Sequence, residues 1–342
     1  MDSSIYETDE TVVTHASRRD EDVLRVVVTD GSSDIALSFL YRILSDEVFG
    51  PDQSIFVSVY EFPEKAVFLE SVAIELTFFS PNLLHDITYG HDASVAFKDA
   101  DIVFCIGSAR EYAFSEQEHT DLFYKEYIYA ARDYGEFIEK YAKRDARIIV
   151  LGNTAATVIS RYARSIPRKN ITALSFFNMQ MAVAHIAAQA DCHPTEVKNV
   201  IVWGNNNRYC FLDCRYMYLA NGKEVTDDLK VWLRNDLPSI MQNTLRRPMY
   251  LRSMAYALAE HVKILWNGTP KDQWICMGVL SDHSYGISAG TFFCYPVYCK
   301  NKEYEIVQGL VDDEYISRYI LDICRLTIRD VEIALELCGL DN

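Results

Sequence analysis

Short apolar runs alternate with amphipathic stretches along the first half of the chain, and this alternation constrains the fold more than any other feature. The first run, LRVVV at 24–28, is followed by a turn cluster of Asp, Gly and Ser at 30–34 and by apolar residues at helical spacing at 35–41. A strand, a turn and a helix in this order begin a βαβ unit. Further strands are predicted at 55–60, 102–107 and 146–152, and helices at 66–79 and 124–141. We therefore expect a mostly parallel sheet with helices on both faces and right-handed crossovers.

The pattern changes after about residue 155. Helices are predicted at 178–190, 251–267 and 313–337, and strands at 200–204, 276–280, 291–297 and 304–307. This mixture is typical of an α+β region. Neither an internal repeat nor a low-complexity linker separates it from the first half, so we expect the two halves to pack tightly together.

The charge balance argues against several classes of partner. The 342 residues include 33 Lys and Arg against 49 Asp and Glu, a formal net charge of −16. A nucleic-acid or anionic-membrane surface needs a basic face, so no nucleic acid and no membrane is expected as a partner. No apolar run approaches the roughly 20 residues that a membrane span needs.

The start of the chain and its cysteines favour a cytoplasmic protein without a metal. Residues 1–22 are acidic and lack the basic and apolar regions of a secretory signal, so we expect a disordered extension. Nine cysteines are an odd number in a long chain, which favours reduced thiols. Cys210 and Cys214 are four residues apart, and Cys294 and Cys299 five; neither spacing is that of a zinc site.

A set of unrelated segments occurs in an order that identifies a family. These segments are VFGPDQ (48–53), VAFKD (95–99), VKNVIVWGN (197–205), MGVLSD (277–282) and SYG (284–286). Over about residues 23–340 the chain resembles cytosolic-type malate dehydrogenases. The resemblance implies an α/β fold, in which a Rossmann-type doubly wound parallel sheet is followed by an α+β lactate/malate dehydrogenase C-terminal domain. It divides the chain into the extension at 1–22, a dinucleotide-binding domain at 23–155 and a substrate domain at 156–342.

The same resemblance places uncharged residues where the family has its catalytic groups. The family's His base corresponds to Asn206, the Asp that orients it to Asn178, and a substrate-binding Arg to Met181. Hydride transfer needs a base for the hydroxyl proton and cations for the substrate carboxylates. General acid–base catalysis contributes roughly 10²–10⁴-fold in rate, and catalytic groups act as a unit. No intact catalytic set is therefore predicted.

Three other residues are candidate remnants of that site. Arg110 is the one arginine left in the segment that matches the family's mobile loop. His283 lies next to Ser284, which matches a Ser that contacts substrate in the family, so His283 is a candidate substitute base. The alternative is an ordinary histidine in a surface loop. Besides these three, His185 lies one helical turn beyond Met181 and is a second candidate substitute base. A histidine of the core or of an interface is the alternative for it.

The cofactor-binding residues implied by the resemblance are also altered. In the glycine-rich turn only Gly31 remains, displaced by one position, because Asp30 and Ser33 stand at the family's glycine positions. The alternative is an ordinary turn with a helix cap. Glu61 ends a strand where an acid binds the adenosine ribose, or else is simply solvated. Asn153 is retained after Gly152. We expect no tightly bound cofactor, with weak NAD binding left open.

Two functions follow from these observations. The first is a catalytically inactive malate-dehydrogenase-like protein that acts by binding other proteins; some divergent members of the family are associated with motile cilia. The alternative is an NAD-dependent malate dehydrogenase, or a related 2-hydroxy acid oxidoreductase, with an altered site. The family's homodimer is expected through the helix at 66–79, with Phe68, Val72 and Leu76 in one apolar row. The alternative is that this helix is buried within its own subunit.

Overall fold

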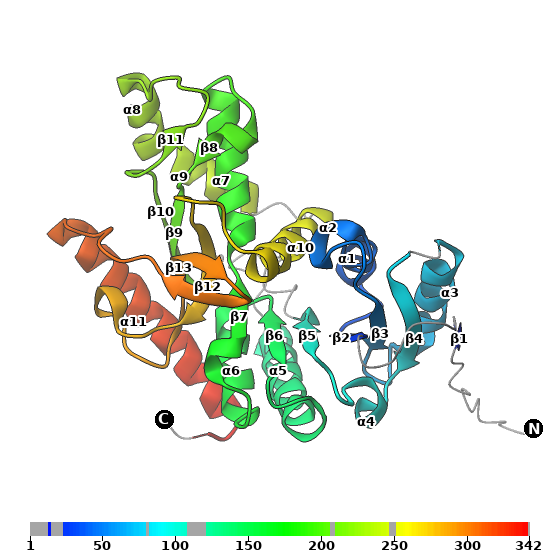
Figure 1. Cartoon of the computed structure of the whole chain (residues 1–342). Helices are drawn as coiled ribbons and strands as arrows, with labels where there is room; N and C mark the ends of the chain where they lie inside the picture. The colour runs from blue at the N-terminus through cyan, green and yellow to red at the C-terminus, as the bar shows by residue number, and fades with distance from the viewer. Residues whose placement is uncertain are drawn as a thin grey trace, which may run out of the picture.

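The computed structural model describes residues 13–14, 23–79, 82–107, 121–205, 209–245 and 251–340. A sheet of twelve described strands runs through the whole molecule, in the order β1-β4-β3-β2-β5-β6-β7-β12-β13-β9-β10, with β14 beside β13 (Figure 1). The strands of its first half are β1 (Val13–Thr14), β2 (Leu24–Val28), β3 (Ile55–Tyr60), β4 (Leu84–Gly90), β5 (Ile102–Cys105), β6 (Arg147–Val150) and β7 (Ile171–Leu174). Those of the second half are β9 (Ile201–Asn205), β10 (Tyr209–Asp213), β12 (Ile275–Leu280), β13 (Phe292–Lys300) and β14 (Glu303–Ile306), while β8 (Val197–Lys198) and β11 (Tyr218–Leu219) pair separately.

The strands from β2 to β7 are parallel, which confirms the doubly wound sheet expected from the sequence. Val26 of β2 pairs with Val57 of β3 on one side and with Ile102 of β5 on the other. Strand order reverses between β2 and β5, and in open α/β sheets ligands bind at the carboxyl ends of the strands at such a point. The parallel part includes β7 and thus continues past residue 155, where the sequence pattern places the boundary.

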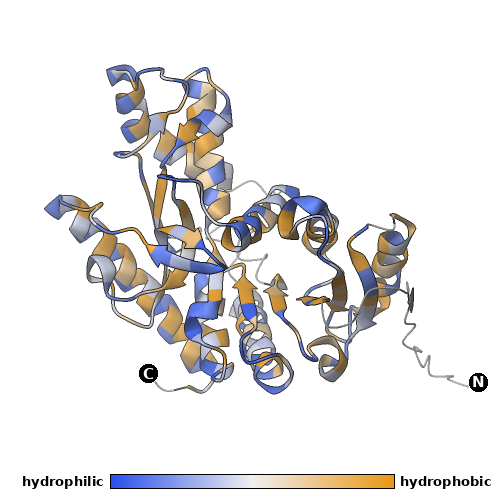
Figure 2. Cartoon of the chain, viewed as in Figure 1, coloured by the Kyte–Doolittle hydropathy of each residue, from blue (hydrophilic) through white to orange (hydrophobic). Residues whose placement is uncertain are grey.

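Helices cover both faces of the sheet. The described helices are α1 (Asp34–Ile43), α2 (Asp46–Phe49), α3 (Leu69–Phe79), α4 (Ala93–Ala96), α5 (Asp121–Tyr141), α6 (Asn153–Tyr162), α7 (Phe176–Gln189), α8 (Asp227–Asn235), α9 (Leu237–Leu245), α10 (Leu251–Asn267) and α11 (Glu314–Leu337). One apolar core contains side chains of α1, α3, α7 and α10, and the other those of α4, α5, α6 and α11. Figure 2 shows hydrophobic residues concentrated on the strands and on the inner sides of these helices.

The two halves pack tightly, as expected. Strand β12 pairs antiparallel with β7, at Met277 and Leu174, so the sheet is continuous across the junction. Helix α10 of the second half also lies on α1 and α2 (Figure 1). There the rings of Phe49 and Trp266 meet edge to face at 5.0 Å, and the Asn267 amide donates to the Val48 carbonyl at 3.0 Å.

One expectation for the start of the chain is wrong in part. Val13 and Thr14, placed in a disordered extension, form β1 and pair antiparallel with Ile87 and Asp86 at the edge strand β4. The backbone of an edge strand has a free side, and pairing with it orders this short segment. The rest of the extension lies outside the described residues.

The described part of the chain contains no helix long and apolar enough to cross a membrane. It also contains no group of three or more His, Cys, Asp or Glu side chains able to hold a metal ion.

Candidate functional site

The turn between β2 and α1 lies at the carboxyl end of the sheet and is shaped by packing and capping. Gly31 rests directly on β3, since a Cβ atom there would lie 2.1 Å from Cγ1 of Val59. Ser33 begins α1, and its hydroxyl accepts a hydrogen bond from the Ala36 amide at 3.2 Å. Gly31 therefore allows the turn to pack closely on β3, and Ser33 caps the N-terminus of α1. A phosphate contact at Gly31 stays a prediction.

Asp30 takes an unusual conformation in this turn and points across the crevice between β2 and β5. Its φ is +49°, in the left-handed region that favours glycine. Its carboxylate lies against Gly107, where a Cβ would be only 2.2 Å from Oδ2. The hydroxyl of Tyr134 donates to Oδ2 at 2.7 Å. Burial, and then the negative charge of Asp30, raise the pKa of Tyr134 well above its usual value, so the phenol stays a donor.

Glu61 is almost fully buried at the end of β3, so the alternative of a solvated side chain is wrong. One carboxylate oxygen accepts hydrogen bonds from the Ser32 amide at 3.3 Å and from the Ser32 hydroxyl at 2.6 Å. The other accepts from the Phe62 amide at 3.0 Å. Glu61 therefore holds the neighbouring turn in place. Ribose binding by Glu61 stays a prediction.

Asn153 begins α6 at the junction of the two halves. It is fully buried, and its amide nitrogen donates to the Gly204 carbonyl on β9 at 3.2 Å. Its oxygen has no partner among the described residues and lies against Gly278, where a Cβ would be 2.0 Å away. The retained asparagine thus connects the parallel sheet with the strands of the second half.

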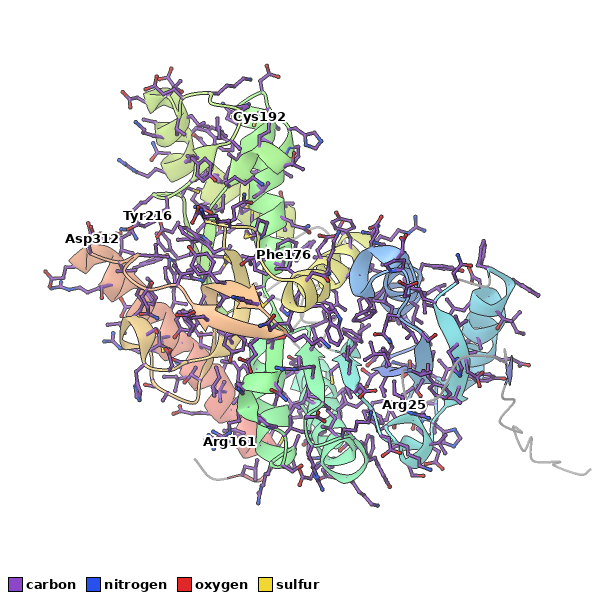
Figure 3. All side chains as sticks on the ribbon, in the orientation of Figure 1. Arg25, Arg161, Phe176, Cys192, Tyr216 and Asp312 are labelled. Atoms are coloured by element: carbon purple, nitrogen blue, oxygen red, sulfur yellow. The ribbon has the colours of Figure 1, made fainter. Side chains whose placement is uncertain are left out.

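Asn178 and Met181 lie on the first turns of α7 and have different surroundings. Asn178 is 1% exposed, and neither Oδ1 nor Nδ2 of its amide has a hydrogen-bond partner among the described residues. Met181 is half-buried and lines a groove of about 870 Å³ between α7, α10 and β8. Figure 3 places Phe176, the first residue of α7, where this helix approaches α10. Asn206 lies outside the described residues, directly after the buried Asn205 that ends β9.

The remaining candidate residues lie in loops and helices of the second half or outside the described residues. His283 is exposed in a loop, with a φ of +76°. Ser284 is held by its neighbours: its amide donates to Asp282 at 2.9 Å, and its hydroxyl accepts from the Gln308 amide at 2.7 Å. His185 contacts the Thr244 hydroxyl at 3.3 Å, which fits the structural role considered for it. Arg110 lies outside the described residues.

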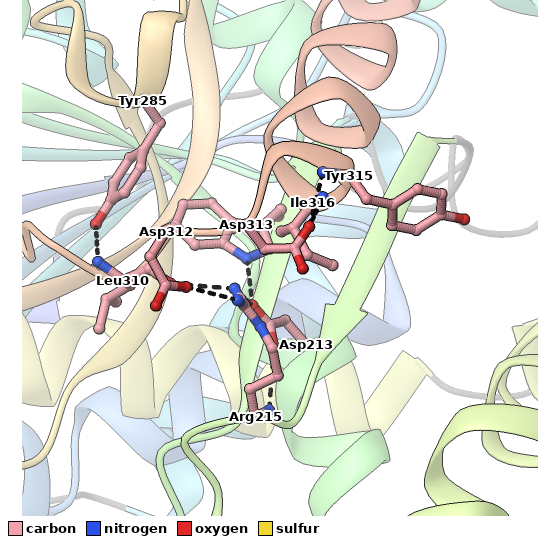
Figure 4. Close-up of polar contacts among 9 residues, drawn as sticks. Asp213, Arg215, Tyr285, Leu310, Asp312, Asp313, Tyr315 and Ile316 are labelled. Carbon is pink, nitrogen blue, oxygen red and sulfur yellow. Dashed lines mark hydrogen bonds and ion pairs between the residues drawn. The ribbon is translucent and has the colours of Figure 1, made fainter.

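A polar network that the sequence did not reveal fixes the loop after β14. Asp213, at the end of β10, is 1% exposed and accepts from the Trp203 indole at 3.2 Å and from the Arg215 guanidinium at 2.8 Å. Arg215 also donates to the Leu310 carbonyl at 3.1 Å and pairs with Asp312 (Figure 4). The hydrogen bond to Asp213 raises the pKa of Arg215. Since Tyr285 packs on the Trp203 ring at 4.8 Å, the network also positions the loop that carries His283.

Comparison with known proteins agrees with this architecture. Residues 250–318 match the family model described as lactate/malate dehydrogenase, alpha/beta C-terminal domain. The chain is 33% identical to the cytoplasmic malate dehydrogenase of Homo sapiens over 319 residues, covering 88% of this chain and 93% of that protein. It is 32% identical to that of Taenia solium over 308 residues, covering 85% of this chain and 92% of that protein.

Solved structures show the same fold. A malate dehydrogenase from Naegleria fowleri superposes with a TM-score of 0.83 at 24% identity, covering 92% of this chain and 98% of that chain. A Trichomonas vaginalis lactate dehydrogenase in complex with NADH and oxamate gives a TM-score of 0.74 at 19% identity, covering 92% and 99%. With relatives above 30% identity aligned over most of its length, the chain belongs to the lactate/malate dehydrogenase family and is similar to cytoplasmic malate dehydrogenases.

Proposed function

We propose that the protein is a member of this family without hydride-transfer activity on malate or oxaloacetate, and that it acts by binding other proteins. The observation that carries the proposal is Asn178. An imidazole base becomes an imidazolium during proton transfer, and a neighbouring carboxylate stabilises that charge. A buried amide carries no charge, and within the described part of the chain both polar atoms of this one lack a partner.

Met181 also supports the proposed lack of hydride-transfer activity. Met181 presents a thioether to the groove beside α7, at the position where the resemblance implies a substrate-binding arginine. A thioether is a weak acceptor and cannot form a charge-assisted bond to a carboxylate. A dicarboxylate would therefore find neither an oriented base nor this cation.

A steady-state assay tests the proposal. The unaltered protein should neither oxidise malate nor reduce oxaloacetate above the blank. The combined variant Asn178→Asp, Met181→Arg and Asn206→His restores base, orienting carboxylate and cation together. A gain of turnover should also need the segment that matches the family's mobile loop and a site open to NADH. Robust turnover by the unaltered chain would refute the proposal.

The second candidate function is that of a catalytically active NAD-dependent oxidoreductase with a different substrate. It is favoured by Glu61 and Asn153, which keep the residue types that the resemblance implies for cofactor binding. An NADH titration of the unaltered protein separates the two candidates, because binding in the micromolar range would favour the oxidoreductase.

We also propose that the protein forms a homodimer through the segment 66–79. Four residues of this segment, Leu69, Val72, Ala73 and Leu76, are buried, so two members of the apolar row expected from the sequence, Val72 and Leu76, pack within their own subunit. The outward side carries a different apolar set, with exposed fractions from 46% to 81%: Val67, Phe68, Ile74, Phe78 and Phe79. So many exposed apolar side chains on one segment are typical of an interface.

We place the protein in the cytoplasm. The relatives that cover most of its length are named as cytoplasmic enzymes, and this supports the placement. A ciliary or flagellar role stays a prediction, which immunolocalisation in ciliated cells would test.

A further inference from the structure

The crevice where β2 and β5 separate is the place at which a sheet of this order binds a ligand. A separate cavity of about 10 Å³ lies between β5, β6, α5 and α6, and Gly107 and Tyr134 belong to its lining. Such a volume holds about one water molecule, so α5 packs closely beneath this end of the sheet. The crevice itself is bordered by the side chains of Asp30, Glu61, Phe62 and Tyr134.

Asp30 and Tyr134 bridge the crevice from opposite walls. Asp30 belongs to the turn after β2, and Tyr134 to α5, 104 residues later in the chain. Their hydrogen bond of 2.7 Å joins a carboxylate to a phenol that is only 2% exposed. Asp30 has a φ of +49°, and its negatively charged carboxylate lies against the backbone of Gly107. A pyrophosphate approaching this turn would meet that charge instead of backbone N–H groups.

Aromatic rings fill the space next to this bond. The ring of Phe62, which follows Glu61, stacks on the ring of Tyr134 at 5.6 Å between centroids, with an angle of 25°. Tyr60 meets both rings edge to face, at 5.8 and 6.2 Å. These are the distances of close aromatic contacts. A planar base could enter only by displacing Phe62 from Tyr134.

Glu61 adds to the closure, because it is 1% exposed and accepts three hydrogen bonds from its own chain, which use most of the acceptor positions of a carboxylate. Ser32 supplies two donors to one oxygen, and Phe62 supplies one to the other. The side chain at the end of β3 is thus directed to its own chain and away from an external hydroxyl group.

We propose that Asp30, Glu61, Phe62 and Tyr134 form an internal plug that closes the crevice to dinucleotides and fastens α5 to the turn before α1. The residues present do not fit NAD. The plug stabilises the fold, because the Asp30–Tyr134 hydrogen bond and the stacking of Phe62 on Tyr134 join distant segments. These contacts keep the crevice closed without a ligand. This inference concerns binding alone and is independent of the proposed loss of hydride transfer.

An NADH titration of opened variants tests the plug. Asp30→Gly removes the charge and the strained φ, and Phe62→Ala removes the stacked ring. The double variant should bind NADH at least tenfold more tightly than the unaltered protein, about 1.4 kcal/mol. Micromolar NADH binding by the unaltered protein would overturn the plug. So would a double variant that keeps its far-UV circular dichroism but binds no more tightly.

A double-mutant cycle tests the fastening. Tyr134→Phe removes the hydroxyl and should lower the melting temperature, but this loss should disappear in the Asp30→Gly background. Tyr162→Phe is the matched control, because its hydroxyl donates to the Cys338 carbonyl at 3.1 Å, at the far end of α6 from the crevice. Its effect should be the same in both backgrounds. Equal losses for Tyr134→Phe in both backgrounds would show that the two residues are not coupled and would overturn the proposal.

If the opened variant binds NADH but still fails to turn over malate, the proposed function stands and the plug is confirmed. If the unaltered protein binds NADH tightly without turnover of malate, the plug is refuted, the proposed lack of activity on malate stands, and an oxidoreductase with another substrate becomes the favoured candidate.

Discussion

Replacing Asn178 by leucine should make the protein more stable. The side chain is 1% exposed, and the part of the chain that the structure describes offers no partner to either polar atom of its amide. Each buried polar group without a hydrogen bond costs about 1–3 kcal/mol. An apolar side chain of similar volume removes both groups, at a packing cost of up to about 1.5 kcal/mol. Two such groups, less the packing cost, give an expected net gain in the free energy of unfolding of about 0.5–6 kcal/mol.

Asn170 provides the matched control for this exchange. It is also buried, but its amide nitrogen donates to the Asp145 and Ala146 carbonyls at 3.0 and 3.3 Å, and its oxygen accepts from Arg147 at 3.0 Å. Asn170→Leu should lower stability by about 1–3 kcal/mol, because it leaves these partners unsatisfied.

Urea unfolding followed by far-UV circular dichroism measures both variants. The midpoint should rise for Asn178→Leu and fall for Asn170→Leu, with similar slopes. A fall of similar size in both variants would refute the reasoning, since it would mean that Asn178 makes polar contacts important to the folded state.

The other predictions concern protonation, assembly and catalysis. Burial lowers the pKa of His261 from 6.5 to about 3. Its contribution to stability is therefore present above pH 6.5 and lost as the pH falls towards 3, by up to about 1.4 kcal/mol per pH unit. His261→Gln should flatten the pH dependence of the urea midpoint in this window, and an unchanged pH dependence would contradict this. Phe78→Asp, on the exposed side of α3, should dissociate the proposed dimer in light scattering without loss of helical content, whereas Val231→Asp, at an exposed apolar residue of α8, should not; a monomer before any substitution would contradict the dimer. Asn206→His alone should give no robust turnover of malate, and activity in that variant would contradict the proposed need for the orienting carboxylate and the cation.

The sequence predicted the parallel core well because its strands are continuous apolar runs. Strand β2 and helix α1 appear at the predicted residues, since apolar spacing and the Ser33 cap both mark the boundary. Strands β4, β7 and β10 were not predicted. Strand β4, LHDITYG, has polar residues through its length, and β7, ITAL, is only four residues long. Strand β10, YCFLD, is a short run that ends in a buried aspartate.

The arrangement of the site was less accessible from the sequence, because it depends on contacts between distant segments. The resemblance identified Asp30 as a departure from the family, but nothing in the spacing connects it with Tyr134, on a helix 104 residues later. Glu61 was considered as a solvated strand end because its partner Ser32 lies 29 residues earlier. For the helix at 66–79, a four-residue spacing grouped Phe68 with Val72 and Leu76, but the packing on β3 and β4 buries the last two and exposes the first.

The most direct test of the central claim is a search for hydride transfer in a single turnover. The protein is mixed, in excess over the nucleotide, with oxaloacetate and NADH that carries deuterium at the transferable position, and the malate formed is analysed by mass spectrometry. A cytoplasmic malate dehydrogenase in parallel provides the positive control. The account predicts no deuterated malate beyond the protein-free blank. Deuterated malate formed at a rate within about a hundredfold of the control, the order of magnitude that general acid–base catalysis supplies, would contradict it.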